Sequence, residues 1–99
     1  MEKYDLTKQA KEDLFNIWLY TQSTWSEVQA DKYYTRFITA FEQLSNNPIF
    51  SGINYDQLHL GLKGLIVGKH IIFHLMQDSG RVLIVRILHV SMDYKQHLR

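Results

Sequence analysis

The chain has 99 residues, of which 45% are hydrophobic and 21% are charged, a composition typical of one soluble globular domain. Its formal net charge is +1, so bulk charge gives no reason to expect binding to a polyanion. The absence of cysteine excludes disulfide bonds, a thiol nucleophile and a cysteine-based zinc site. Charge is nevertheless uneven: residues 1–50 carry seven acids and five bases, whereas residues 51–99 carry three acids, six bases and all five histidines. The C-terminal half is therefore expected to present a weakly basic face.

The first fifteen residues mix acidic and basic side chains and lack the apolar stretch that a signal peptide needs. No apolar run in the sequence approaches the ~18 residues of a membrane span. We therefore expect a cytoplasmic protein with no membrane partner.

A first helix is expected to begin after Thr7, whose side chain suits the N-cap position, and residues 4–6 are a candidate edge strand ahead of it. Phe15 and Leu19 form an apolar pair beside the main stripe of this helix. Peripheral packing is the commoner explanation for such a pair, and contact with a partner is the alternative. The main stripe itself recurs at helical spacing: Ala10, Leu14, Ile17, Trp18, Thr21 and Trp25.

A second helix is predicted from Ser26-Glu-Val-Gln29, which matches a capping box. The segment Asn46-Asn47-Pro48 is expected to end it. The short connection around Trp25 makes the two helices an antiparallel hairpin. The aromatic stripe of the second helix favours a core position over a platform for stacking bases. This stripe comprises Ala30, Tyr33, Tyr34, Phe37, Ile38, Phe41 and Leu44.

The second half of the chain changes to the pattern of strands. Residues 48–64 contain the one proline and three of the five glycines, and we expect an ordered loop there. Strands are predicted at 65–67, 70–77 and 82–89, separated by turns at Gly68-Lys69 and Asp78-Ser79-Gly80. The expected fold is α+β, with an N-terminal antiparallel helix hairpin packed on a C-terminal antiparallel sheet of three to four strands. Residues 1–99 are expected to form a single domain.

Alternation along the strands divides the sheet into two faces. The less polar set is expected to face the helices: Ile71, Phe73, Leu75, Leu83, Val85, Ile87 and His89. The other set is expected on the outer face: His70, Ile72, His74, Met76, Val82, Ile84, Arg86 and Leu88. An apolar outer face left open would mark a binding surface, and the alternative is that the 48–64 loop and the C-terminal tail fold over it. Arg86, in an aliphatic strand, needs an ionic partner.

Motifs that carry chemistry are scarce. No nucleotide-binding, zinc-protease or nucleophile-elbow motif is present. In a strand His70 and His74 are ~13 Å apart, too far for common chelation. A zinc site of His89, Asp93 and His97 on a helical tail has suitable ligand types but no supporting signal. Lys63, Arg81, Arg86 and His89 are candidates for a metal-free nuclease site, although such strand residues are more often structural. We therefore expect no catalytic residue, metal or cofactor.

At this point the sequence resembles the ParE toxins of the RelE/ParE superfamily of bacterial toxin–antitoxin modules, nearly end to end. The N-terminal half matches at Ala10-x-x-Asp13-Leu14-x-x-Ile17, Trp25, Gln29-Ala30, Tyr33 and Asn47-Pro48. The C-terminal half matches at Gly61-Leu62-Lys63, His70-Ile-Ile-Phe73, Val85-Arg86-Ile87-Leu88-His89-x-x-Met92-Asp93 and His97-Leu98. The chain departs from the family at His74-Leu75, where Tyr-Arg is common, and at Lys63, where arginine is common. Replacing arginine by lysine at position 63 would affect function if a bidentate contact is needed there.

The resemblance implies a toxin that poisons DNA gyrase without catalysis and is neutralised by the C-terminal segment of a ParD-like antitoxin. No sequence-specific DNA binding is expected without that antitoxin. The alternatives are a ribosome-dependent mRNA endonuclease of the RelE type and a decayed toxin that only binds its antitoxin. Antitoxin contacts are expected on the outer face at Ile72, His74, Met76, Val82, Ile84, Arg86 and Leu88. Target contacts are expected at Lys63, Arg86, His89, Met92, Asp93 and Lys95.

Overall fold

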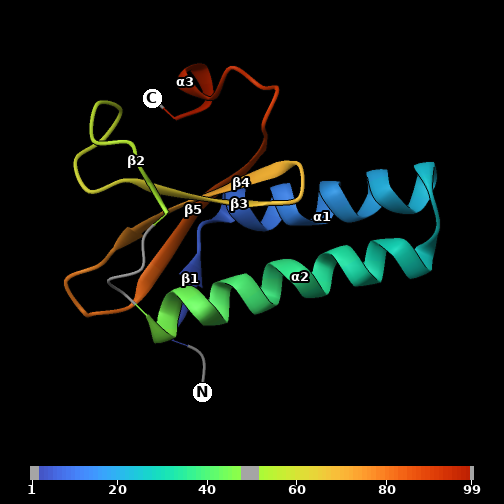
Figure 1. The fold of residues 1–99 in the computed structure, drawn as a ribbon, viewed down its shortest axis with the longest axis horizontal. Coiled ribbons are helices and arrows are strands. Elements are labelled where there is room, and N and C mark those ends of the chain that lie inside the picture. The colour runs from blue at the N-terminus through green and yellow to red at the C-terminus, as the bar shows by residue number, and fades with distance from the viewer. Residues whose placement is uncertain (1–2, 48–51, 99) are drawn as a thin grey trace.

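A computed structural model describes residues 3–47 and 52–98, and its chain trace is shown in Figure 1. The fold is α+β, as the sequence predicts, and two long helices pack on one sheet. None of the helices in the described ranges is long and apolar enough to cross a bilayer. In chain order the elements are β1 (Tyr4–Leu6), α1 (Lys8–Thr24), α2 (Glu27–Asn46), β2 (Ile53–Asn54), β3 (Lys63–Val67), β4 (His70–Met76), β5 (Val82–His89) and α3 (Tyr94–His97).

The sheet is mixed and has five strands in the order β1-β5-β4-β3-β2. This exceeds the three to four antiparallel strands expected from the sequence. The candidate edge strand at residues 4–6 is present as β1, and it pairs parallel to β5. The additional strand, β2, contributes two residues that pair antiparallel to β3. All other neighbouring strands are antiparallel.

Both long helices begin at the side chains that the sequence predicts. The Ala10 amide donates to Thr7 Oγ1 at 3.0 Å, and the Gln29 amide donates to Ser26 Oγ at 3.1 Å. These bonds satisfy amides that a helix N-terminus otherwise leaves unpaired. The Thr7 hydroxyl also donates to the Val85 carbonyl at 2.7 Å, so the start of α1 is tied to β5. The Asn47 amide, following α2, bonds to Gln43, and Pro48 lies outside the described residues.

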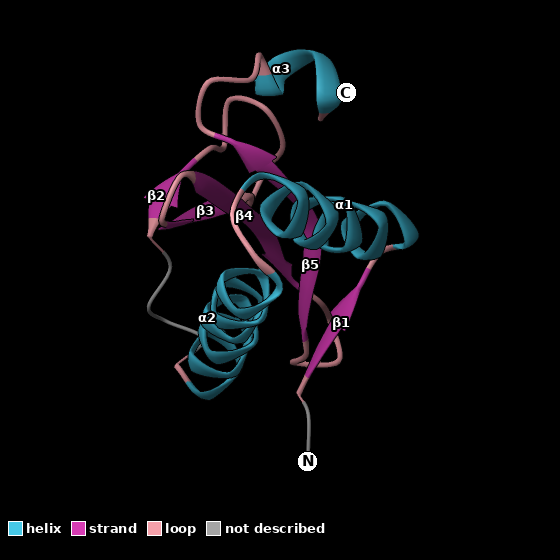
Figure 2. Ribbon diagram, turned by 90° about the vertical axis from the view of Figure 1, so that its right-hand side faces the viewer, coloured by secondary structure: helices cyan, strands magenta, loops and turns pink. Residues whose placement is uncertain are grey.

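The main core lies between the helix hairpin and one face of the sheet. Figure 2 shows the two long helices nearly end-on, with the strands of the sheet running past them. The main core follows the apolar stripes of α1 and α2, so the aromatic stripe of α2 is largely core. Tyr34 is an exception because it is exposed. The buried members of this core are Tyr4, Ala10, Leu14, Phe37, Ala40, Phe41, Leu44, Ile72, Val82, Ile84 and Ile87.

The face assignment made from the sequence is wrong for most of the sheet. Ile72, Val82 and Ile84 were expected on the outer face, yet they are buried beneath the helices. The alternation of β5 also changes partway, because Phe73 pairs with Arg86 while the next residue of β4 pairs with Ile84. Val85 is thus an extra residue in a β-bulge, which shifts the facing of the strand by one position. Ile87, beyond the bulge, faces the helices as expected.

The outer face is covered by the chain itself. Ile71, Phe73 and Leu88 form a second buried cluster on that side, together with Tyr55 and Leu62 of the loop between β2 and β3. Two partly buried leucines from the loop and from the C-terminal tail also pack against this cluster: Leu58 and Leu98. The alternative raised from the sequence, that loop and tail fold over the outer face, is therefore what the structure shows. Residues 48–51 of the predicted loop lie outside the described residues.

Candidate functional site: the interhelix groove

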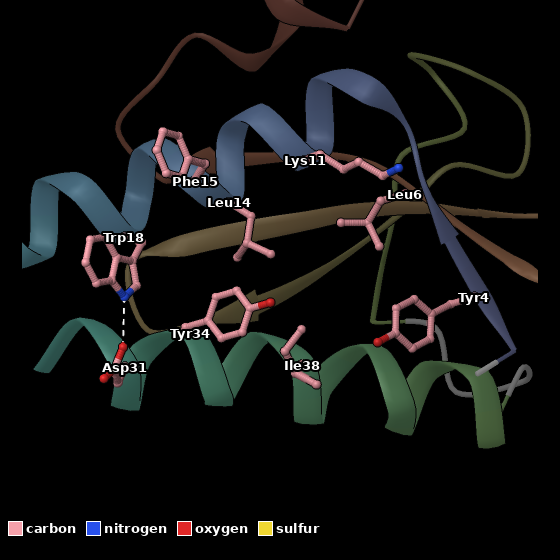
Figure 3. A pocket seen from close by; sticks show the side chains of 9 residues that line it. All are labelled: Tyr4, Leu6, Lys11, Leu14, Phe15, Trp18, Asp31, Tyr34 and Ile38. Carbon is pink, nitrogen blue, oxygen red and sulfur yellow. Dashed lines mark hydrogen bonds between the residues drawn. The ribbon is translucent and has the colours of Figure 1, made fainter. Parts of the chain in front are cut away.

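An apolar surface that the described residues leave uncovered lies between the two long helices. A groove of about 550 Å³ runs between α1 and α2 and ends against β1, and Figure 3 shows its lining side chains. We call it the interhelix groove. It is lined by Tyr4, Leu6, Lys11, Leu14, Phe15, Trp18, Asp31, Tyr34 and Ile38.

The floor and rim of the interhelix groove follow from the helical period. Leu14 belongs to the core stripe of α1, whereas Phe15 lies one residue, or about 100°, further round the helix and is 60% exposed. Tyr34 and Ile38, one turn apart on α2, form the opposite wall. A mainly apolar cleft of this size that carries a few polar groups is typical of a binding site. Phe15 belongs to the apolar pair for which a partner contact was the alternative to peripheral packing, whereas Leu19, the other member, is not among the lining residues.

Two of the nine lining side chains are charged, and they lie at different ends of the groove (Figure 3). Trp18 Nε1 donates to Asp31 Oδ1 at 2.9 Å, and this bond joins α1 to α2 at the end nearer the hairpin tip. Lys11 extends toward Leu6 at the β1 end. The groove therefore has a negative end and a positive end.

Arg86 has its ionic partner within the chain. Its Nε and Nη2 donate to the two carboxylate oxygens of Asp13 on α1, at 2.7 and 2.9 Å, and both side chains are largely buried (15% and 13% exposed). The carboxylate raises the pKa of Arg86 above its usual value. Asp13 also accepts a hydrogen bond from the Ile87 amide at 3.0 Å. Ile87 lies on the part of β5 that β1 does not pair with. The ionic partner that Arg86 needs is thus a residue of the chain itself.

The residues expected to contact antitoxin do not form one surface. Ile72, Val82 and Ile84 lie in the main core, and Leu88 lies under the loop and tail. Arg86 is held by Asp13. His74 is buried, and Met76 is the one member that is exposed.

Of the residues expected to contact the target, Arg86 is held by Asp13, and the others fall in two places. His89 and the exposed Met92, Asp93 and Lys95 lie together in sequence, from the end of β5 to α3, and His89 Nδ1 is 2.6 Å from Ser91 Oγ. Lys63 of β3 pairs with His74 of β4. His70, four residues from His74 on the same strand, pairs with His89 of β5. At the rise of a strand this separates Lys63 from the His89 end by roughly 13 Å.

The histidines of β4 face the helices and are held neutral. Burial, aided by the positive charge of Lys63, lowers the pKa of His74 to about 4, and its Nε2 has no hydrogen-bond partner among the described residues. Burial and the neighbouring His89 likewise lower the pKa of His70 to about 4. His70 Nδ1 is 2.7 Å from the Tyr33 hydroxyl. The described parts of the chain contain no group of three or more side chains arranged to bind a metal.

Arg81 lies at the opposite end of β5 from His89. Its guanidinium donates to both carboxylate oxygens of Asp5 at 2.9 and 2.8 Å, and to the Tyr4 carbonyl. The hydrogen bond from Arg81 lowers the pKa of Asp5 to about 2. Eight residues of strand place Arg81 and His89 about 26 Å apart. The four side chains considered for a nuclease site therefore do not meet at one point.

Comparison with known proteins agrees with the fold and with the sequence motifs. Residues 4–94 match the family described as "ParE toxin of type II toxin-antitoxin system, parDE". The chain is 33% identical to Toxin ParE1 of Caulobacter vibrioides over 99% of both chains. It is 30% identical to Toxin ParE1 of Mycobacterium tuberculosis over 97% of both. A solved structure described as "Chromosomal ParDE TA system from P. aeruginosa" has the same fold, with a TM-score of 0.73, 16% identity, and coverage of 90% of this chain and 98% of that one.

Proposed function

Because the chain belongs to the ParE toxin family of type II toxin–antitoxin systems, we propose that it inhibits DNA gyrase and is held inactive by a ParD-like antitoxin. The observation that carries this proposal is the match to relatives named Toxin ParE1, which extends over nearly the whole length of both chains. The interhelix groove offers the antitoxin a place to bind, since it is a mainly apolar cleft whose wall includes the exposed Phe15 and Tyr34.

The inhibition is proposed to need no catalysis by this chain. Metal-free cleavage of RNA needs a base and a phosphate-binding cation within hydrogen-bond reach of one phosphodiester. Arg81 and Arg86 are each held by a carboxylate of the chain, and Arg81 is about 26 Å along β5 from His89. His74, at a position where the family commonly has tyrosine, is buried and neutral. These placements favour a protein inhibitor over an endonuclease.

Supercoiling by purified gyrase and cleavage of mRNA on translating ribosomes should be measured side by side with the same preparation of the protein. We expect loss of supercoiling with intact mRNA, and restoration of supercoiling when the antitoxin encoded beside the chain is added. Ribosome-dependent cleavage with normal supercoiling would assign the protein to the endonuclease alternative. Binding of antitoxin with no effect in either assay would identify a decayed toxin.

A further inference from the structure

We propose that His70 of β4 and His89 of β5 form a two-imidazole binding site for a divalent transition metal such as Zn²⁺. This inference goes beyond the proposed toxin function and does not depend on it. Neither zinc arrangement considered from the sequence contains this pair, because its two members lie 19 residues apart on different strands.

Strand pairing brings the two histidines together. His70 and His89 are cross-strand partners in the antiparallel pair of β4 and β5. The Val90 amide donates to the Lys69 carbonyl at 2.9 Å, so His70 and His89 form a non-hydrogen-bonded pair, in which facing side chains approach most closely. Both side chains therefore leave the same face of the sheet, with Cβ atoms about 4.5–5.5 Å apart.

The two rings have the separation that a shared metal requires. Their centres are 5.2 Å apart and their planes meet at 86°, so the rings do not stack on each other. With Zn–N bonds of about 2.0–2.1 Å, a metal lies about 3.2 Å from each ring centre, and tetrahedral ligands then place the two centres about 5.2 Å apart. Imidazole is a ligand that suits Zn²⁺, Ni²⁺ and Cu²⁺.

The Nε2 atoms of both rings are open to solvent. Neither Nε2 forms a hydrogen bond with a described residue. Both histidines are partly buried, and within the described ranges the side-chain nitrogen that is buried without a partner belongs to His74. It follows that Nε2 of His70 and Nε2 of His89 reach solvent, from which a metal ion can bind them.

The Nδ1 atom of His70 is held by a hydroxyl group, as metal-binding histidines are commonly held by an acceptor. It lies 2.7 Å from the Tyr33 hydroxyl oxygen, which also accepts the Lys69 amide and lies 3.1 Å from the Val67 carbonyl. All these groups are satisfied when Tyr33 donates its proton to Val67 and His70 donates from Nδ1. The lone pair of His70 then lies on Nε2, where a metal needs it.

His89 changes tautomer when it binds metal, and this change limits the affinity. Its Nδ1 accepts the Ser91 amide at 3.1 Å and lies 2.6 Å from Ser91 Oγ, so the neutral ring carries its proton on Nε2. Metal binding displaces that proton, and Nδ1 takes one up from solvent and donates it to Ser91 Oγ. The Ser91 amide loses its acceptor, so we expect an exchangeable metal rather than a structural one. Two imidazoles leave two tetrahedral positions for water or a partner's side chain.

Titration of the protein without a histidine tag tests the site directly. Calorimetry with Zn²⁺ is expected to show a single binding event, and Mg²⁺, which prefers oxygen ligands, is expected to show none. In the same titration, the imidazole NMR signals of His70 and His89 should shift together. The signals of the exposed His59 and His97 should stay in place.

Single variants identify the ligands. His70→Gln and His89→Gln each remove one ligand and should weaken Zn²⁺ binding at least about tenfold, while Ser91→Ala, which removes the hydroxyl acceptor at an exposed position, should weaken it about tenfold. His97→Gln is the matched control, because it removes an exposed imidazole of the tail that a site made of the tail alone would need.

Three results would overturn the proposal. The first is a wild-type chain that does not bind Zn²⁺. The second is binding that His97→Gln weakens as much as His89→Gln does, which would assign the metal to the tail. The third is unchanged affinity in both His70→Gln and His89→Gln. Circular dichroism shows whether each variant folds, and if one does not, the imidazole shifts of the wild-type protein decide.

Discussion

The guanidinium of Arg86 and the carboxylate of Asp13 form a two-point ion pair that joins the middle of β5 to the first turns of α1. The two residues are 73 positions apart in sequence. The same carboxylate accepts the Ile87 amide. β1 pairs with the edge of β5 as far as Ile84. Beyond that point, Asp13 of α1 takes over the hydrogen bonding of this edge.

Removal of Asp13 is expected to cost more stability than removal of Arg86. Asp13→Ala leaves a largely buried guanidinium unpaired and the Ile87 amide without its acceptor, which should lower the free energy of unfolding by about 3–5 kcal/mol. Arg86→Ala leaves the carboxylate still bonded to that amide and should cost less. Urea unfolding of both single variants and the double variant measures the coupling. Equal losses for the two single variants would contradict this assignment. If Arg86→Ala folds and binds antitoxin normally but is no longer toxic, Arg86 also contacts the target.

Ile84→Asp is expected to unfold the protein rather than only weaken antitoxin binding. Ile84 is fully buried in the core between sheet and helices, so the variant would bury an unpaired charge and lose an aliphatic contact. The loss should be at least 4 kcal/mol, or about the whole stability of a small domain. Circular dichroism checks this directly. A folded variant with reduced antitoxin affinity would instead support the outer-face assignment made from the sequence.

Phe15→Ala should weaken antitoxin binding with little effect on stability. An aromatic side chain at the centre of an interface commonly contributes about 1–3 kcal/mol, or roughly ten- to a hundredfold in affinity. Val28→Ala is the matched control, since Val28 is similarly exposed (62%) on α2 but does not line the groove. Calorimetry of both variants, with melting curves, separates the two effects. Wild-type affinity of Phe15→Ala would remove the interhelix groove as the docking surface.

Acid should destabilise the fold through its buried histidines. The pKa of His74 is about 4 in the folded protein and 6.5 ordinarily, so between these values the unfolded chain binds the extra proton and stability falls as pH decreases. The full effect, reached below pH 4, is about 3 kcal/mol for His74. His74→Leu should remove this part of the pH dependence and, since Nε2 has no partner within residues 3–47 and 52–98, should not destabilise the protein at pH 7. His97→Leu, at an exposed position, serves as the control in urea titrations at pH 4.5 and 7.

Thr7→Ala should cost about 1–2 kcal/mol. The variant loses the cap of α1 at Ala10 and the hydroxyl donor to the Val85 carbonyl at the β-bulge. Thr7→Ser keeps both bonds and should cost much less. Chemical denaturation of the pair measures the difference, and equal losses would mean that the methyl group of Thr7, not its hydroxyl, matters.

Local patterns in the sequence determined most of the secondary structure. The caps at Thr7 and Ser26, the helix hairpin and the strands from β3 to β5 were all predictable because capping, helical period and strand alternation depend on neighbouring residues. The family was also evident from the order and spacing of short motifs. The nine lining residues of the interhelix groove were not, although Phe15 and Leu19 had raised the possibility of a partner contact.

Tertiary structure decided which surface is covered. Strand alternation shows which residues share a face, but it does not show which face meets the helices, and the bulge at Val85 breaks the alternation within β5. The presence of Arg86 in one set suggested an outer face, yet its partner, Asp13, lies 73 residues away. The cover that Leu58, Leu62 and Leu98 give the outer face likewise depends on contacts distant in sequence. Such contacts are set by packing of the whole chain, so the sequence predicted the elements while the packing placed the open apolar surface between α1 and α2.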